Sequence, residues 1–247
     1  MRIAWATPFN RQSTIARDFS LPIACALLER GHRVDIVRTE VHRAAALPAL
    51  EILAPIHPPL GFAGRVSLDV FDAIVINWAD DFQLHGGALA LTPQAPTVAI
   101  LHAGDMRRFA AAAVKLYGMA AGHFVRPFPA APPRSEAAAG RDGVLAWFAS
   151  LAAGAVVHEA EWLAPVAAAC PGPVRFIAAT GSAKTYLDEL LPLLDAAIGA
   201  RPLVEAGFQF GAMFEACGAR PDEPAIGRVA AVMAELFARH DREERPA

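Results

Sequence analysis

Short, almost wholly apolar runs recur along the first two thirds of this chain, separated by longer amphipathic segments. Five runs are clear and a sixth is shorter: residues 2–6, 33–37, 72–77, 97–102, 154–158 and 174–177. Near-continuous apolar runs are typical of strands buried on both faces, as in a parallel sheet covered by helices. The alternation therefore predicts an α/β fold, a Rossmann-like parallel sheet with flanking helices.

The segment between the first two runs has the signals of a single helix. Ser20 is placed to cap a helix over residues 21–30, with Pro22 in its first turn, where a missing N–H costs little. Gly31 stands where that helix is expected to end. Residues 1–37 thus predict one strand–helix–strand unit.

The pattern changes after Ala178. Leu187, Leu190, Leu191 and Leu194 recur at helical spacing, and later apolar residues do the same. We expect a Rossmann-like domain over residues 1–178 and C-terminal helices over residues 179–247 that pack on it.

Composition excludes several classes of protein. The 247 residues include 22 Lys+Arg and 25 Asp+Glu, a net charge of −3, which does not suit a nucleic-acid binder. No run of about 18 uncharged apolar residues is present, so no transmembrane helix is predicted. Cys25, Cys170 and Cys217 have no paired spacing, which predicts free thiols, a cytoplasmic protein and no metal cluster.

Four well-known motifs are absent or incomplete. Residues 181–185, GSAKT, resemble a phosphate-binding loop, but their lysine does not follow a glycine. His158-Glu159 begins like a zinc-protease helix that lacks its second histidine. Neither G-x-G-x-x-G after the first run nor G-x-S-x-G occurs. The two motifs that would best support a dinucleotide-dependent oxidoreductase or a serine hydrolase are therefore missing.

Polar residues follow the apolar runs where the predicted strands end. Ligands bind at this carboxyl edge of an open α/β sheet, beside the point where the strand order reverses. His102 and His158 could act there as general bases or bind an oxygen of a sugar or phosphate. The other strand-end residues are Asn10, Arg11, Asn77, Asp80, Asp81, Asp105 and Glu159.

Each of these residues also has a purely structural interpretation. A strand-end histidine often only bonds a loop carbonyl, and Asp80-Asp81 is better explained as a helix N-cap pair. Trp5 and Trp162 are expected in the core or an interface rather than under a sugar ring.

Several stretches together resemble the N-terminal half of a GT-B glycosyltransferase. The nearer resemblance is to the large retaining family that includes bacterial surface-polysaccharide enzymes. The stretches are MRIAWATPF at 1–9, ALLERGHRVDIV at 26–37, FDAIVIN at 71–77 with FQLH at 82–85, PTVAILH at 96–102, and GAVVH at 154–158 with CPGPV at 170–174. The likeness covers residues 1–178.

In that family the N-terminal lobe mainly holds the acceptor, and the C-terminal lobe holds the nucleotide-sugar. The resemblance implies that His102 is the leading catalytic candidate and that Asp105 is a weaker one. It implies an acceptor site formed by Asn10, Arg11, Asn77, His85 and His158.

The chain departs from the family pattern at two points. Ala103 stands where the family often has Asp after the strand-end histidine. After residue 178 there is no further strand–helix run, no donor-type Glu pair and no Arg/Lys pair for a diphosphate. The donor lobe is therefore expected to be missing, and no cofactor is expected to bind tightly. Binding of a nucleotide-sugar donor stays possible, but the sequence has no donor-binding motif to support it.

We therefore expect a glycosyltransferase-like protein of polysaccharide or glycoconjugate biosynthesis with the acceptor-side lobe only, and whether it is an enzyme stays open. One alternative is a non-catalytic acceptor-binding or partner subunit of a separate glycosyltransferase. Another is an unrelated nucleotide- or small-molecule-binding Rossmann-like domain. The expected partners are a sugar or glycolipid acceptor and either a second copy or a donor-lobe protein. Attachment to the periphery of the inner membrane is the alternative to a purely cytoplasmic location.

Overall fold

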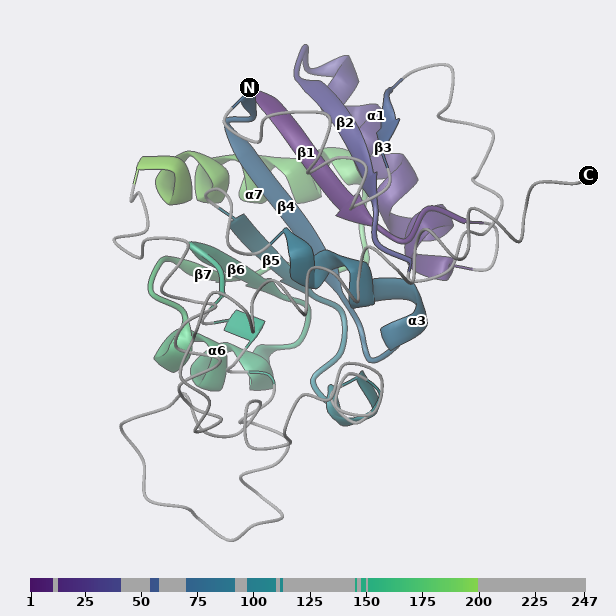
Figure 1. Cartoon of the computed structure of the whole chain (residues 1–247). Helices are drawn as coiled ribbons and strands as arrows, with labels where there is room; N and C mark the ends of the chain where they lie inside the picture. Colours follow the sequence, from purple (N-terminus) through teal and green to yellow (C-terminus); the bar gives the residue numbers. More distant parts are fainter. Residues whose placement is uncertain are drawn as a thin grey trace, which may run out of the picture.

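The computed structural model describes residues 1–10, 13–40, 54–57, 70–91, 97–109, 112, 145, 148–149 and 151–199. Within them the chain forms a seven-stranded, all-parallel sheet with helices on both faces (Figure 1), which confirms the predicted Rossmann-like α/β fold. The strands are β1 (Arg2–Thr7), β2 (Arg33–Arg38), β3 (Ile56–His57), β4 (Ala73–Trp78), β5 (Thr97–Leu101), β6 (Gly154–Val157) and β7 (Val174–Phe176). The helical elements are η1 (Ile15–Ser20), α1 (Leu21–Glu29), α3 (Phe82–His85), η4 (Gly86–Ala90), η6 (Ala160–Trp162), α6 (Leu163–Ala169) and α7 (Ala183–Gly199).

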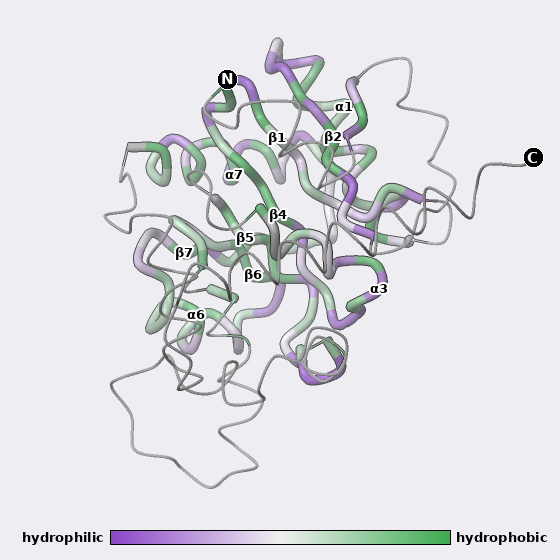
Figure 2. The backbone as a smooth tube through the Cα atoms, viewed as in Figure 1, coloured by the Kyte–Doolittle hydropathy of each residue, from purple (hydrophilic) through white to green (hydrophobic). Residues whose placement is uncertain are grey.

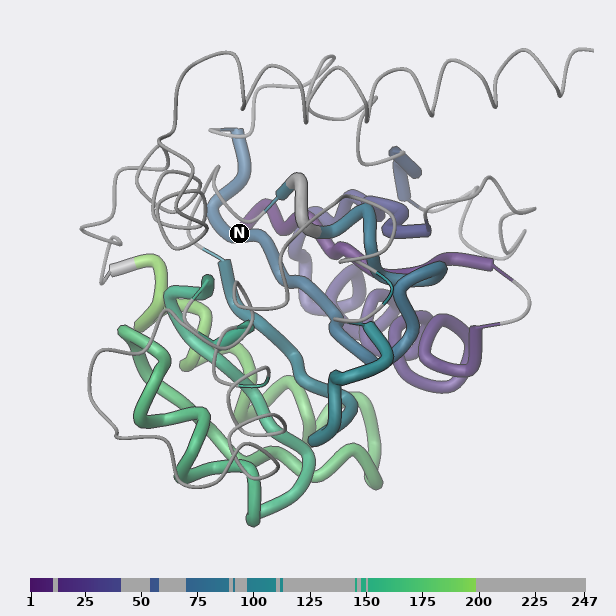
Figure 3. The backbone as a smooth tube through the Cα atoms, turned by 60° about the horizontal axis from the view of Figure 1, so that its bottom comes forward, coloured from purple at the N-terminus to yellow at the C-terminus, as the bar shows by residue number. Residues whose placement is uncertain are grey.

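The strand order is β3-β2-β1-β4-β5-β6-β7. The chain builds the sheet outward from β1 to β3, returns to the other side of β1 at β4, and continues outward to β7. Figure 3 shows this order as a progression from purple segments through blue and teal strands to green ones. Because the order reverses at β1 and β4, the carboxyl ends of these two strands are where such a sheet binds ligands.

Alternate side chains of the strands enter two apolar cores, one on each face of the sheet. Ile3 and Trp5 of β1 pack with α1 and α7, whereas Ala4 and Ala6 pack with α3 and α6. Both faces are therefore buried, which explains why the strands are almost continuously apolar. Figure 2 shows the central strands mostly in the green of hydrophobic residues.

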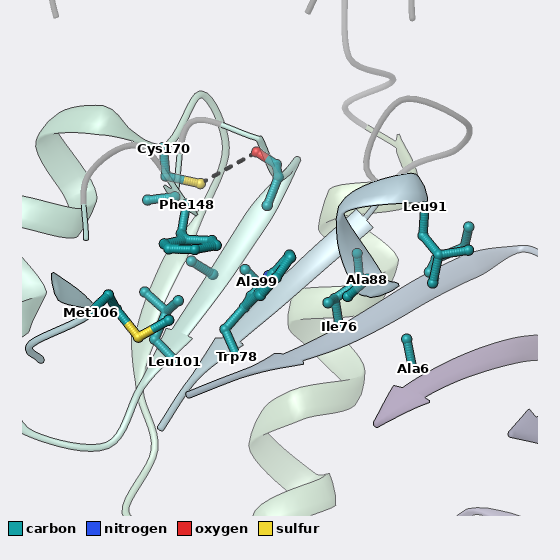
Figure 4. Packing of buried hydrophobic residues seen from close by; sticks show 14 of the residues in the cluster. Ala6, Ile76, Trp78, Ala88, Leu91, Ala99, Leu101, Met106, Phe148 and Cys170 are labelled. Carbon is teal, nitrogen blue, oxygen red and sulfur yellow. Dashed lines mark hydrogen bonds between the residues drawn. The ribbon is translucent and has the colours of Figure 1, made fainter. Parts of the chain in front are cut away.

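The core on the α3 and α6 face is rich in aromatic rings (Figure 4). The Trp78 ring lies 4.6 Å from that of Phe148 and 5.7 Å from that of Phe109. The thiol of Cys170 donates to the carbonyl of Ala152 at 3.6 Å. Cys170 is thus a free, buried thiol, as predicted.

Helix α1 ends as the sequence predicts but begins differently. Gly31 has a φ of +79°, its N–H donates to Leu28, and the N–H of His32 donates to Leu27, so the last carbonyls are satisfied. The predicted cap at Ser20 is wrong, because the π-helical turn η1 runs directly into α1. The Ser20 hydroxyl instead lies 2.8 Å from the Thr7 hydroxyl.

Helix α7 contains the predicted run of leucines and packs against α1, β5 and β6 in one core. Trp5, Trp78 and Trp162 are buried, as was predicted for the first and last of them. Three earlier predictions lie outside the described residues: Arg11, Cys217 and the helices after residue 199.

Gly172 is a position where a larger side chain cannot fit without backbone movement. A Cβ at this position would overlap the carbonyl oxygen of Ala153. We expect Gly172→Ala to lower the free energy of unfolding by about 2 kcal/mol and Tm by roughly 4–8 °C in thermal unfolding followed by circular dichroism. Ala168→Ser, on the exposed side of α6, is the control and should change stability by no more than about 0.5 kcal/mol. Equal Tm values for the two variants would contradict the close contact.

Candidate functional site

Four polar residues line the carboxyl edge of the sheet on the face that α1 and α7 cover. Strand alternation places Thr7 with Trp5 on β1, and Asn77 with Val75 on β4, on that face. His102 and His158 follow β5 and β6 with the same alternation. Since β1, β4, β5 and β6 are neighbours, these four residues form a continuous row. We call Thr7, Asn77, His102 and His158 the polar row.

The amide of Asn77 fixes the orientation of His102. Its Nδ2 donates to the carbonyl of Ala6 at 3.0 Å, so its Oδ1 is left to accept from His102 Nε2 at 2.9 Å. Nε2 of His102 therefore carries the proton, and Nδ1 has the lone pair. Within the described part of the chain, no hydrogen bond to this Nδ1 is formed.

His158 is held by the backbone that follows β7. Its Nδ1 donates to the carbonyl of Ile177 at 2.8 Å, which leaves the lone pair on Nε2. The His158 and His102 rings lie 4.8 Å apart. Burial lowers the pKa of both histidines, and the neighbouring His158 and His85 lower that of His102 further, to well below 6.5. Both rings are therefore neutral at pH 7 and can accept a hydrogen bond or a proton.

Two aromatic residues cover the polar row. The Phe19 ring, from η1, lies 4.7 Å from His102 and 5.5 Å from His158. Tyr186, from α7, lies 5.0 Å from Phe19 and 5.9 Å from His158. Burial, followed by the nearby Glu189, raises the pKa of Tyr186 well above 10, so its hydroxyl stays protonated. Phe19 and Tyr186 form what we call the aromatic cover.

A small pocket opens beside the aromatic cover. It has a volume of about 100 Å³ and lies between the junction of η1 and α1 and the loop that leads from β7 into α7. Its walls include Phe19, Tyr186 and Ile177, together with the carboxylates of Asp18 and Glu189. The pocket therefore connects the cover to solvent.

The loop after β1 is held by a buried carboxylate. Glu40 accepts from the N–H of Phe9 at 3.0 Å, from Asn10 Nδ2 at 3.1 Å and from Arg38 at 3.0 Å. Asn10 Oδ1 in turn accepts from the N–H of Ser13 at 3.0 Å. In dinucleotide-binding sheets a carboxylate in this region binds a ribose. Here its bonds go to the loop, and Asn10 is 2% exposed.

Asp105 belongs to a separate group of ion pairs. It bonds Arg107, while Asp80 accepts from Arg108 and from the N–H of Phe109, around an open hollow next to Ala103. Asp81 caps α3 by accepting from Leu84, which confirms the N-cap prediction for this residue. The structure thus places Asp105 outside the polar row.

His85 lies beneath the carboxyl edge and is fully buried. Its Nδ1 lies 2.7 Å from the backbone carbonyl of Asn77, and burial lowers its pKa to about 4. It fixes the backbone that carries Asn77, and its expected contact with an acceptor stays a prediction.

The sequence therefore indicated three of the four residues of the polar row, namely Asn77, His102 and His158. It missed Thr7, Phe19, Ser20 and Tyr186. The two-residue alternation of β1 could have found Thr7, whereas Phe19 and Tyr186 come from helices whose packing on the edge leaves no local pattern.

No metal centre is present in the described part of the chain, because no three His, Cys, Asp or Glu side chains gather closely enough. No helix among the described residues is long and apolar enough to cross a membrane.

The fold and the site define a Rossmann-like α/β protein whose ligand edge has two neutral histidines under an aromatic cover. No protein-family model matches the sequence, and no curated protein matches it.

The buried histidines make stability depend on pH. The unfolded chain binds protons near pH 6.5, whereas folded His85 resists protonation down to about pH 4. The contribution is therefore fully present above pH 6.5 and falls as the pH drops toward 4, by up to about 3 kcal/mol for this group. We expect the free energy of unfolding to decrease over this range in urea titrations, and the decrease to be smaller in His85→Gln.

The control for that measurement is His32→Gln. Burial is the main cause that lowers the pKa of both histidines, and His32, after α1, is only half-buried whereas His85 is fully buried. This variant should flatten the pH dependence less than His85→Gln does. The opposite order would mean that His85 is not the main acid-sensitive group of the two.

Proposed function

We propose that this chain is the acceptor-binding lobe of a glycosyltransferase-type protein, and that its polar row binds the hydroxyl groups of a sugar acceptor. The observation that carries the proposal is the fixed tautomer of His102. Asn77 holds Nε2, so Nδ1 presents a lone pair at the carboxyl edge of the sheet.

A neutral imidazole with a fixed lone pair suits a hydroxyl ligand. The hydroxyl can donate to Nδ1, and in a transfer reaction His102 can take its proton as general base. Because the pKa of His102 lies well below 6.5, the ring is in the accepting form at pH 7. Asn77 then positions the base and polarises the ring from the opposite side.

The charge of the site supports an acceptor rather than a nucleotide diphosphate. Thr7, Asn77, His102 and His158 include no Lys or Arg, whereas a leaving diphosphate needs cations or helix N-termini. The N-terminus of α7 does line the adjoining pocket, but Ser182 already accepts from the N–H of Thr185 there. Glu189 lines the adjoining pocket and would repel phosphate groups, whereas Asp18 in the same lining is paired with Arg17. The resemblance of residues 1–178 to an acceptor-side lobe leads to the same proposal.

His102→Gln tests this role while keeping a donor for Asn77. The glutamine amide can replace Nε2–H but provides no base. We expect transfer from nucleotide-sugars to sugar acceptors, measured by released nucleotide in the presence of any required donor subunit, to fall at least ~100-fold. Tm without ligand should stay within about 4 °C of wild type, because a donor to Asn77 is retained.

A thermal-shift titration with sugars, UDP and GDP separates the candidate functions. A ligand present at 100 times its Kd adds about 2.7 kcal/mol, or roughly 5–10 °C for a chain of this size. Stabilisation by saccharides that His102→Gln weakens would support the proposal. Stabilisation by UDP or GDP alone would contradict it and favour a nucleotide-binding domain.

A further inference from the structure

Unpartnered polar atoms gather around Phe19. Among the described residues, four buried side-chain polar atoms have no hydrogen-bond partner: Trp5 Nε1, His85 Nε2, His158 Nε2 and the Tyr186 hydroxyl. Three of them belong to rings that contact Phe19, with centroid distances of 6.4 Å to Trp5, 5.5 Å to His158 and 5.0 Å to Tyr186. Buried polar groups are nearly always hydrogen-bonded, so such a cluster requires an explanation.

The Phe19 ring itself offers no strong hydrogen bond to any of these atoms. It contacts Trp5, His158 and Tyr186 through carbon atoms, and each unpaired polar group costs free energy. A residue that covers such groups without satisfying them is suited to being displaced by a ligand that does satisfy them.

We propose that Phe19 is a displaceable cover over a subsite for a neutral sugar ring, formed by Trp5, His158 and Tyr186. The proposal deepens the proposed function and rests on it for the class of ligand. When the Phe19 side chain moves aside, the ring enters from the neighbouring pocket and its hydroxyl groups pair with the three polar atoms.

The chemistry of the three atoms selects a hydroxyl-bearing ligand. Trp5 Nε1–H can only donate, His158 Nε2 can only accept because its proton is on Nδ1, and the Tyr186 hydroxyl can do both. A sugar has hydroxyl groups that donate and accept, together with C–H faces that pack on aromatic rings. Phosphate would meet no Lys or Arg among the residues that line the neighbouring pocket, and the carboxylate residue Glu189 is one of them.

The size of the pocket explains why Phe19 has to move. The present pocket of about 100 Å³ is smaller than the ~300 Å³ at which small-molecule sites begin. Phe19 is half-buried, forms part of the pocket wall and contacts the His158 ring, so displacing its side chain extends the pocket toward His158. Phe19 also lies on η1, a π-helical turn, a geometry that is frequent at functional sites.

Tyr186→Phe is the sharpest test, because it removes one hydroxyl and leaves the ring. The hydroxyl has no partner without ligand, so Tm should be unchanged or slightly raised. Affinity for methyl glucoside, methyl galactoside or methyl mannoside should fall about 5-fold or more for the glycoside that binds the wild type best. Binding is measured by NMR titration of the Trp5 indole N–H resonance, assigned with Trp5→Phe.

Phe19→Ala tests the cover itself. We expect the same glycoside to bind about 3-fold or more tightly, because the cover no longer has to be displaced. The control is Phe71→Ala, which removes a buried ring just before β4, at the opposite edge of the sheet. Both variants should have a lower Tm, but only Phe19→Ala should gain affinity.

The outcomes separate this proposal from the proposed function. A lower Tm for Tyr186→Phe with unchanged glycoside affinity would overturn the subsite, as would inorganic phosphate shifting the Trp5 resonance in place of the glycosides. If only His102→Gln weakens acceptor binding or transfer, the proposed function stands and the subsite fails. If Tyr186→Phe and Phe19→Ala respond as expected while His102→Gln has no effect, the subsite stands and the role of His102 fails.

Discussion

The side-chain amide of Asn77 links the ends of three neighbouring strands at the carboxyl edge of the sheet. It donates to Ala6 on β1 and accepts from His102 after β5, while its backbone carbonyl binds His85. Asn77 is fully buried, so no solvent is at hand to replace any of these bonds. The tautomer of His102 and the side-chain link between the ends of β1, β4 and β5 both follow from this one polar residue at the end of an apolar strand.

The sheet could be predicted because burial on both faces requires apolar residues at almost every strand position. Six predicted strands match β1, β2, β4, β5, β6 and β7 closely, and Gly31 ends α1 as expected. The same reasoning found Asn77, His102 and His158, since in a parallel sheet the ends of neighbouring strands meet at one edge. A residue at the end of a strand can be identified from the strand's own sequence, without knowing any contact to a distant segment.

The cover of that edge could not be predicted, since it depends on contacts between distant segments. Phe19 and Tyr186 are separated by most of the α/β domain, yet their rings lie 5.0 Å apart. Ser20 looked like a helix cap because the sequence gives no sign that a π-helical turn precedes α1. Its hydroxyl bonds Thr7 instead, so η1 is attached to the sheet edge by side chains rather than by a capped helix start.

The distribution of charge around the edge limits the class of ligand more strongly than any motif does. Among the described residues near the edge, Arg38 is paired with Glu40, Arg107 with Asp105 and Arg108 with Asp80, so these three cations are already neutralised by carboxylates. The polar row itself is neutral at pH 7, because burial opposes protonation of His102 and His158. A phosphate brought to the polar row would lose its hydration and meet no cation among these four residues, whereas a hydroxyl-bearing ring exchanges water for donors and acceptors of matching kind. Electrostatics and hydrogen-bond chemistry therefore both support the neutral, polyhydroxylated ligand that we propose.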